Sequence, residues 1–256
     1  MGAASPQFRV RLADSTDDLR AAQALRYEVF VKELGGDGPM VDHDAGLEMD
    51  RFDPFCDHLI LTDEERHSDV VGVYRLMRDD MALQAGQFYS DDEYDLDKLR
   101  RSGRKLMELG RSCLAANYRG GTAMHHLWRA LARYVEDHGV EILFGVASFH
   151  GTDPAPLAAP LSLLHHRHPA PYPLRVRARE GGFQRMDLVP EAALDRRLAM
   201  LQVPALIKAY LRLGGFVGEG AFIDRAFNTT DICLVMDTAR LNARTRAIYA
   251  NGRGTE

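Results

Sequence analysis

Apolar and polar positions follow the clearest pattern in the middle of the chain, where four elements can be predicted in order. Residues 107–114 form a short apolar run typical of a strand, and residues 117–122 are turn-forming. From Ala123 to His138 apolar side chains recur at helical spacing, and Gly139 follows at the position of a C-terminal cap. Residues 142–149 are apolar enough for a buried strand.

The N-terminal third carries similar patterns. Phe8–Leu12 alternates apolar and basic residues as a strand does, and Ser15 begins a capping-box sequence before an amphipathic helix. Residues 58–62 and 70–77 are apolar segments separated by a polar turn. We therefore expect a strand, a helix and two further strands before the central segment.

The C-terminal third is mostly helical in pattern. Residues 154–164 and 190–213 have helical spacing, with Pro154 at a first helical position and Pro204 expected to split the second helix. Residues 232–236 form the last strong strand.

Together these elements predict an α+β protein, an α/β/α sandwich, in a single domain over residues 1–256. Residues 154–225 would be a helical elaboration before the last strand. The tail after Ala247 is expected to be disordered.

The composition, with 46% hydrophobic and 27% charged residues, is that of an ordinary globular protein. The formal net charge of −5 argues against bulk nucleic-acid binding, which favours a strongly basic domain. No apolar run approaches the roughly 20 residues of a spanning helix, and the N-terminus lacks a hydrophobic signal core. The 3 cysteines are widely separated and lack metal spacing. We expect a cytoplasmic protein with free thiols, which could still contact the inner membrane peripherally.

Histidines and arginines crowd one segment of the C-terminal third, termed the basic belt. No Cys, Asp or Glu is spaced to complete a metal site with the histidines, so no metal is predicted. An electropositive docking face for an acidic partner fits the belt better. Its members are His165, His166, Arg167, His168, Arg175, Arg177 and Arg179.

Several charged side chains occupy positions that suit apolar residues. Arg26 borders the apolar face of the first helix, so it either meets a carboxylate or extends along the surface to solvent. Arg75 points the same way as two valines in its strand, which suits an arginine only if it meets an acid or an anionic ligand. Asp50 and Asp53 are its candidate partners, or they are solvated loop acids.

Glu108 and Arg111 fall within the predicted strand 107–114. Their spacing places them on opposite faces of a regular strand, whereas a bulge at Gly110 would bring both to one side.

The turn before the central helix has residues suited to a phosphate. Arg119 supplies a positive charge, Gly120 and Gly121 let the backbone approach a ligand, and free N–H groups begin the helix. Glycines also serve helix starts and caps, so this signal alone is weak. A dinucleotide fingerprint and a P-loop pattern are both absent from the sequence.

The turn and its flanking elements resemble the central motif of the GNAT acyltransferases. In that fold the central sheet is mixed and splayed, and the loop before the third helix cradles the pyrophosphate or phosphopantetheine of an acyl donor. The loop here fits the usual Arg/Gln-x-x-Gly-x-Gly/Ala pattern only if one residue is missing. The residues that the resemblance assigns to the donor phosphate are Arg119, Gly120, Gly121, Thr122 and Ala123.

The N-terminal half resembles one GNAT branch, the acyl-homoserine-lactone (autoinducer) synthases. These show an Arg…Phe pair, a D-x-x-D, a G-x-x-R-L strand, a Phe and an E-x-x-R. The matching residues, in the same order, are Arg26 and Phe30, Asp50 and Asp53, Gly72, Arg75 and Leu76, Phe88, and Glu108 and Arg111.

Nearly the whole chain resembles a sister family, the L-ornithine N-alpha-acyltransferases. The similar segments are LRYEVFVKELG, FDPFCDHLIL, FYSDDEYDL, ELGRSCLAANYRGG, FGVASFHGTDP, LIKAYLRLGG and AFNTTDICLVMD. The resemblance implies transfer of a 3-hydroxy fatty acyl group from the phosphopantetheine of acyl carrier protein to the alpha-amine of L-ornithine. The product would be lyso-ornithine lipid, in the first step of ornithine lipid biosynthesis, with no permanently bound cofactor.

The resemblance also implies roles for single residues. Glu108 is the first choice for the base, directly or through water. Asp50 and Asp53 would hold the ammonium groups of the amino acid, and Arg75 or Arg111 its carboxylate. The alternative is that these charges form one structural network that only shapes the cleft.

Five further residues complete the expected site. Arg26, Phe30 and Phe88 would line the acceptor side, and Ser148 and His150 lie where the thioester or acyl chain would pass. The basic belt, together with Arg100, Arg101, Arg104 and Lys105, would dock the acidic carrier protein. The rival interpretations are an autoinducer synthase that uses S-adenosylmethionine, a CoA-dependent acetyltransferase, and a non-catalytic carrier-binding module.

Overall fold

The computed structural model describes residues 5–66 and 69–240, so the tail after Ala247 lies outside the described residues. The chain forms two compact units, and strand β5 contributes to both. The described residues of the first unit are 5–66, 69–85 and Leu109–Gly139, and those of the second are Gly86–Glu108 and 140–240.

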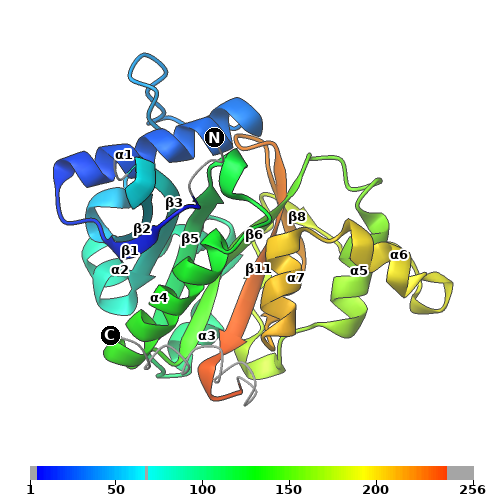
Figure 1. Ribbon diagram of the computed structural model, residues 1–256. Coiled ribbons are helices and arrows are strands. Elements are labelled where there is room, and N and C mark those ends of the chain that lie inside the picture. The colour runs from blue at the N-terminus through cyan, green and yellow to red at the C-terminus, as the bar shows by residue number, and fades with distance from the viewer. Residues whose placement is uncertain (1–4, 67–68, 241–256) are drawn as a thin grey trace. The chain divides into compact units, whose positions relative to one another are not determined.

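The first unit is a sheet covered by helices (Figure 1). Its strands lie in the order β1-β2-β3-β5, and β2 pairs antiparallel with both β1 and β3. Helix α1 begins at the predicted cap, where Asp18 N donates a hydrogen bond to Ser15 Oγ (3.1 Å). The elements are β1 Phe8–Leu12, α1 Thr16–Arg26, a π-helix Tyr27–Glu33, β2 Asp57–Asp63, β3 Asp69–Arg78, α2 Asp79–Ala85, the second half of β5 Leu106–Leu114, and α4 Ala123–His138.

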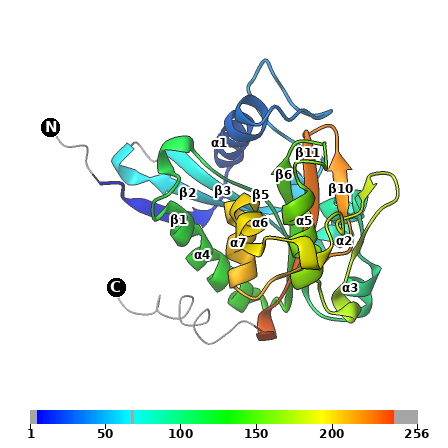
Figure 2. The same cartoon turned by 90° about the vertical axis from the view of Figure 1, so that its right-hand side faces the viewer.

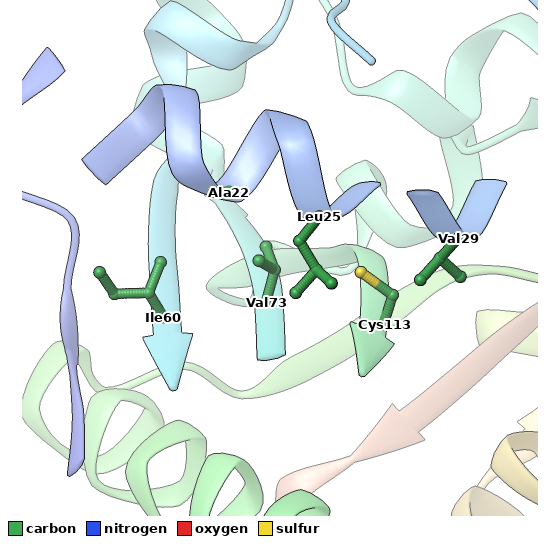
Figure 3. Close-up of a cluster of buried hydrophobic side chains, with 6 residues drawn as sticks. All are labelled: Ala22, Leu25, Val29, Ile60, Val73 and Cys113. Atoms are coloured by element: carbon green, nitrogen blue, oxygen red, sulfur yellow. The ribbon is translucent and has the colours of Figure 1, made fainter. Parts of the chain in front are cut away.

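Helix α1 packs on one face of this sheet and α4 on the other. Gly72 in β3 faces α4, where an added Cβ would lie 2.7 Å from Leu114 Cδ2 and 3.1 Å from Leu127 Cδ1. Its neighbour Val73 points to the opposite face, as strand alternation requires. The predicted α/β/α sandwich is therefore confirmed. The buried cluster on the α1 face consists of Ala22, Leu25, Val29, Ile60, Val73 and Cys113 (Figure 3).

The second unit is built around β6, which has β5 parallel on one side and β11 antiparallel on the other. Its strand order is β5-β6-β11-β10-β8, with β9 also paired to β11, so the sheet is mixed as predicted. Strands β4 and β7 form a separate pair. The elements are β4 Tyr94–Asp95, α3 Asp97–Arg101, β6 Ile142–His150, α5 Ala158–Arg167, β7 Arg177–Ala178, β8 Phe183–Gln184, α6 Arg196–Gln202, α7 Ala205–Arg212, β9 Phe216–Val217, β10 Ala221–Asp224 and β11 Thr229–Asp237.

The region 154–225 lies in the second unit and is helical only in part, because β7 to β10 also come from it. Pro204 splits α6 from α7 as predicted, and α7 packs against β11 (Figure 2). The predicted start of α5 at Pro154 was wrong: Asp153 Oδ1 accepts a hydrogen bond from Ala155 N (3.0 Å), which favours a turn there. In the described part of the chain, no helix combines the length and apolar character needed to cross a membrane. The prediction of a single domain stays a prediction.

Candidate active site

Six charged side chains of the first unit form a closed ring in which acids and arginines alternate. The members of this ion-pair ring are Arg26, Glu48, Asp50, Asp53, Arg75 and Arg111. Arg26 lies between two carboxylates, with Nε 2.5 Å from Glu48 Oε2 and Nη1 2.8 Å from Asp53 Oδ1. The positive and negative charges balance, which lowers the cost of burying each of them.

Arg75 and Arg111 complete the ring. Arg75 Nη1 donates to Asp50 Oδ2 (2.6 Å) and to Asp53 Oδ1 (2.9 Å). Arg111 joins Asp50 back to Glu48, through Nη2 to Asp50 Oδ2 (3.1 Å) and Nε to Glu48 Oε1 (3.1 Å). Each carboxylate therefore contacts two guanidinium groups, and each guanidinium group contacts two carboxylates.

The ring is buried on one side and accessible on the other. The side chains of four members are at most 3% exposed, and that of Arg26 is 0% exposed. The Asp50 side chain is 17% exposed and that of Arg111 is 10% exposed. The pair of Asp50 and Arg111 is therefore the edge of the ring that solvent or a ligand can reach.

Burial and ion pairing act in opposite directions on the carboxyl groups of the ring. Burial alone would raise their pKa values, because it disfavours the charged form. The neighbouring guanidinium groups outweigh burial, so the pKa values of Glu48, Asp50 and Asp53 lie below their ordinary values. The three acids are therefore charged at neutral pH.

Local backbone geometry brings the acids to Arg26. Arg26 is the last residue of α1, where the helix widens into the π-helix. The segment after Asp50 turns sharply, because Phe52 N donates to Asp50 Oδ1 (2.9 Å) and Asp53 N donates to Asp50 O (3.3 Å). Gln23, nearly one turn before Arg26, donates from Nε2 to Asp53 Oδ2 (3.0 Å). Two segments of the chain thus hold Asp53 in place.

Part of this ring was among the alternatives that the sequence left open. Arg26 meets carboxylates and does not extend to solvent, and Arg75 meets the candidate acids Asp50 and Asp53. Glu48 and Gln23 were missed as ring contacts. The only sequence signal for Glu48 is its place just before Asp50, in a segment rich in acids.

Strand β5 is irregular at Arg111, one residue after the bulge position considered from the sequence. Arg111 has a φ of 49°, in the left-handed region that is uncommon for residues other than glycine. Gly110 lies beside the ring, where an added Cβ would make an ordinary van der Waals contact of 3.8 Å with Arg75 Nε. The alternation rule for regular strands therefore does not apply at Arg111.

Glu108, in the second unit, is held by the backbone of a neighbouring segment. Its Oε2 accepts a hydrogen bond from Tyr89 N (2.7 Å), and its Oε1 accepts one from Ser90 N (2.7 Å). The hydroxyl of Ser90 also donates to Oε1. These three donors favour the charged carboxylate. Glu108 therefore has a clear structural function beside any role in catalysis.

Phe30 and Phe88 both lie in apolar packing. Phe30 packs against the buried cluster of the first unit, and Phe88 is 3% exposed in the second. The ring of Phe88 meets that of Phe144 edge to face, with centroids 5.0 Å apart. Packing alone can explain why both positions are aromatic. Contact of Phe30 and Phe88 with substrate stays a prediction.

The loop before α4 is exposed, and its arginine already has partners. Arg119 Nε donates to Leu114 O (3.0 Å), and Nη1 lies 2.8 Å from Glu33 Oε2. Gly120 has a φ of 78°, which favours glycine. The first turn of α4 contains no acid, and the Thr122 side chain makes no capping hydrogen bond. This helix start has the partial positive charge that suits an anion. Phosphate binding here stays a prediction.

Ser148 and His150 are exposed and share one face of β6. Pairing with β11 sets Ser148 opposite Asp231 and His150 opposite Thr229. The structure thus brings these two candidates together, and their catalytic role stays a prediction.

The arginines of the basic belt and its neighbours are largely ion-paired. Arg104 makes two hydrogen bonds to Asp237, of 2.9 Å and 2.6 Å. Arg177 binds Glu219 (2.5 Å) and Glu180 (2.8 Å). The surface is therefore less positive than the sequence suggests, and carrier docking stays a prediction. Further pairs are Arg100–Asp91, Arg101–Asp97 and Arg167–Glu191.

Comparison with known proteins defines the class. Residues 25–129 match the family model of the acetyltransferase (GNAT) domain. FeeM, an N-acyl amino acid synthase from uncultured soil microbes, aligns with a TM-score of 0.58 at 12% identity, covering 95% of this chain and 98% of that one. The AHL synthase LasI aligns with a TM-score of 0.53 at 15% identity, covering 98% and 99%. At such identities the structures show a common fold, and together with the matched domain they identify it as the GNAT fold.

Two relatives narrow this class to one family. The L-ornithine N(alpha)-acyltransferase of Rhodobacter capsulatus is 58% identical over 261 aligned residues, which cover 99% of this chain and 100% of that protein. The L-ornithine N(alpha)-acyltransferase of Brucella abortus is 42% identical, covering 94% of this chain and 88% of that protein. The chain belongs to the L-ornithine N(alpha)-acyltransferase family, as the sequence resemblance predicted.

Proposed function

We propose that this protein transfers a 3-hydroxy fatty acyl group from acyl carrier protein to the alpha-amine of L-ornithine, forming lyso-ornithine lipid. The observation that carries the proposal is the 58% identity to the Rhodobacter capsulatus protein along the whole of both chains. The name of that relative supplies the acceptor and the acylated amine. The carrier-bound donor and the lipid product come from the family resemblance of the sequence.

The exposed edge of the ion-pair ring is the proposed acceptor site. An amino acid presents a carboxylate and an ammonium group, and the edge presents one cation, Arg111, and one anion, Asp50. The guanidinium fork of Arg111 suits a carboxylate, and Asp50 suits an ammonium group. Asp53 and Arg75, which are buried behind this edge, would then act as positioning residues.

The proposed donor site is the start of α4. The phosphate of phosphopantetheine would accept hydrogen bonds from Arg119 and from the amides of Gly120 to Ala123. The absence of acids from the first turn of α4 supports this assignment. Ser148 and His150, exposed at the end of β6, are proposed to lie along the path of the thioester or acyl chain.

Amide formation requires an uncharged amine. The ammonium group first gives one proton to a base, and the nitrogen then attacks the thioester carbonyl carbon. The new C–N bond forms, the C–S bond breaks, and the second proton passes from nitrogen to the departing thiolate. Glu108 is the proposed base, acting directly or through water. The three hydrogen bonds that Glu108 accepts stabilise its carboxylate and so weaken it as a base. A test must therefore separate proton transfer by Glu108 from its hydrogen bonds with Tyr89 and Ser90.

Product analysis tests this function. The purified protein is incubated with a 3-hydroxyacyl carrier-protein thioester and L-ornithine, and mass spectrometry should detect the alpha-amide. Matched reactions replace the carrier thioester with the corresponding acyl-CoA or with acetyl-CoA, and ornithine with S-adenosylmethionine. A lactone product would overturn the ornithine acceptor, and equal turnover of free CoA thioesters would overturn carrier dependence. If no donor gave an amide, the acyltransferase function itself would be rejected.

A further inference from the structure

Three carboxylates of the second unit converge at a place that the proposed reaction does not use. Glu93, Asp224 and Asp231 each offer one oxygen, and these oxygens lie within 4.8 Å of one another. Glu93 is 5% exposed and Asp231 is 3% exposed, while Asp224 is half-buried. Three negative charges at such separations are costly unless protons or a cation compensate for them.

Strand pairing and one hydrogen bond from a neighbouring segment build this cluster. Thr229 and Asp231 are two residues apart in β11, so their side chains share one face of the sheet. Asp224 in β10 is paired directly with Thr229. Tyr94, the neighbour of Glu93, donates its hydroxyl hydrogen to Asp231 O (2.9 Å). This bond fixes the Glu93 backbone beside β11.

Two buried oxygens in the cluster have the character of ligand atoms. Asp231 Oδ1 and Thr229 Oγ1 have no hydrogen-bond partner within the described residues, and Thr229 is 7% exposed. A buried polar atom left without a partner costs about 1–3 kcal/mol, so native proteins usually satisfy it with protein, water or an ion. In the ion-pair ring, by contrast, every acid faces two arginines.

Strand geometry also places Thr229 beside the two aspartates. Thr229 shares its face of β11 with Asp231 and is paired directly with Asp224 in β10. The Thr229 hydroxyl is therefore available as a fourth oxygen of the cluster.

We propose that Glu93, Asp224 and Asp231, with Thr229 as a fourth ligand, bind an oxygen-preferring divalent cation of the class of Ca²⁺, Mg²⁺ and Mn²⁺. These hard ions take carboxylate, hydroxyl and water oxygens. Half-buried Asp224, and exposed Ser148 opposite Asp231, give the ion access from solvent. The ion would tie β10 and β11 to the segment before β4 and stabilise the second unit. Sequence spacing predicts no metal here, because the acids come from separated segments.

Metal titration of the full chain, first stripped with a chelator, tests the proposal. CaCl₂, MgCl₂ and MnCl₂ are each followed by isothermal titration calorimetry and thermal unfolding. At least one ion should bind and raise Tm by several degrees, because it binds only the folded state. Asp231→Asn and Glu93→Gln should each bind it about tenfold more weakly or worse. Asp187→Asn, at an exposed aspartate paired with Arg185 (2.9 Å), should bind it like the wild type.

The metal-free proteins provide a second readout. Without metal, Asp231→Asn should unfold at a higher temperature than the wild type, because it removes one of three crowded charges. Loss of a purely structural aspartate would lower Tm instead. Absence of binding for all three ions, or equal binding by Asp231→Asn and the wild type, overturns the proposal. Binding of L-ornithine that Asp231→Asn abolishes, with no response to metals, also overturns it and assigns the cluster to an ammonium group.

Discussion

Arg111 Nη2 and Asp50 Oδ2 lie 3.1 Å apart and form the accessible edge of an otherwise buried ring. Each also binds a buried member, Arg111 through Nε to Glu48 and Asp50 through its carboxylate to Arg75. A ligand at this edge would meet one cation and one anion whose positions are fixed by residues that it cannot reach. Such preorganisation reduces the cost of orienting an amino acid for reaction.

Arg111→Lys should impair amino-acid binding more than donor binding. Lysine keeps the charge, but its ammonium group cannot span Glu48 and Asp50 as the guanidinium fork does. The KM for L-ornithine in steady-state kinetics should rise about tenfold or more, with the donor KM nearly unchanged. Arg20→Lys, at an exposed position of α1, is the matched control and should change neither. Equal increases in both KM values at Arg111 would contradict the assignment.

Arg26→Leu should destabilise the first unit strongly. The change leaves Glu48 and Asp53 facing an apolar side chain, and removing one partner of a buried ion pair costs about 3–5 kcal/mol. Urea denaturation should show that loss in the free energy of unfolding. Lys32→Ala, which breaks the exposed pair with Glu28 (2.6 Å), should leave the free energy nearly unchanged. Similar effects at the two positions would show that the ring contributes little to stability.

The ring should also make stability depend on acid pH. The folded-state pKa of Asp53 lies below its ordinary value of 3.8, because the attraction of Arg26 and Arg75 outweighs burial. As the pH falls, the unfolded chain takes up the proton first, so the stabilisation is complete above about pH 5 and declines below about pH 4. Chemical denaturation of the wild type and Asp53→Asn from pH 7 to pH 3 should give a difference that is largest at neutral pH. A difference that stayed constant, or grew in acid, would rule out this linkage.

Elements with local signals could be predicted from the sequence. Helix α4 occupies the expected residues Ala123–His138, and Gly139 caps it with a φ of 62°. Strand β1 has its expected bounds, Phe8–Leu12. The start of α5 was wrong because two local signals compete there: Pro154 suits a first helical turn, while the side chain of Asp153 stabilises a turn.

The ion-pair ring could be predicted only in part, because its closure is not local. Acidic partners for Arg26 and Arg75 were among the alternatives, because a charge at an apolar position requires a partner. Glu48 lies in a segment rich in acids, where one more acid does not stand out, and it was missed. Arg111 reaches the ring through a left-handed backbone conformation, which strand alternation does not predict. The cluster of Glu93, Asp224 and Asp231 was missed for a related reason, since contacts between separated segments of the chain assemble it.

Glu108→Gln separates a base from an anchor. Glutamine cannot take up the proton, and its NH₂ group would face the N–H of Tyr89 or Ser90. If Glu108 is the base, kcat should fall by about 10²–10⁴. The free energy of unfolding should also fall by about 1–3 kcal/mol, because a buried donor loses its acceptor. Ser90→Ala, which removes only the hydroxyl donor, should keep most of kcat. If kcat fell equally in both variants under folding conditions, Glu108 would be a positioning residue.

Thr122→Asp should have opposite effects on folding and on donor binding. Thr122 is the exposed residue before α4. Its side chain accepts no hydrogen bond from the N–H groups at the helix start, and the first turn contains no acid that could do so. A carboxylate there lies near the positive end of the helix dipole, so stability should rise by about 0.3–1 kcal/mol. The same charge would repel the donor phosphate, and the KM for the carrier-protein thioester should rise about tenfold. The KM for L-ornithine should stay near the wild-type value.

Thr122→Asn separates charge from shape in the same experiment. Asparagine has nearly the same size as aspartate and no charge, so the donor KM should stay within about twofold of the wild type. Added salt should reduce the effect of Thr122→Asp, because ions screen exposed charges. If Thr122→Asp gained stability but kept its donor KM, the start of α4 would not hold the donor phosphate. If both variants lost donor affinity equally and without salt dependence, the loop would act through its shape, and the anion-binding role of this helix start would be rejected.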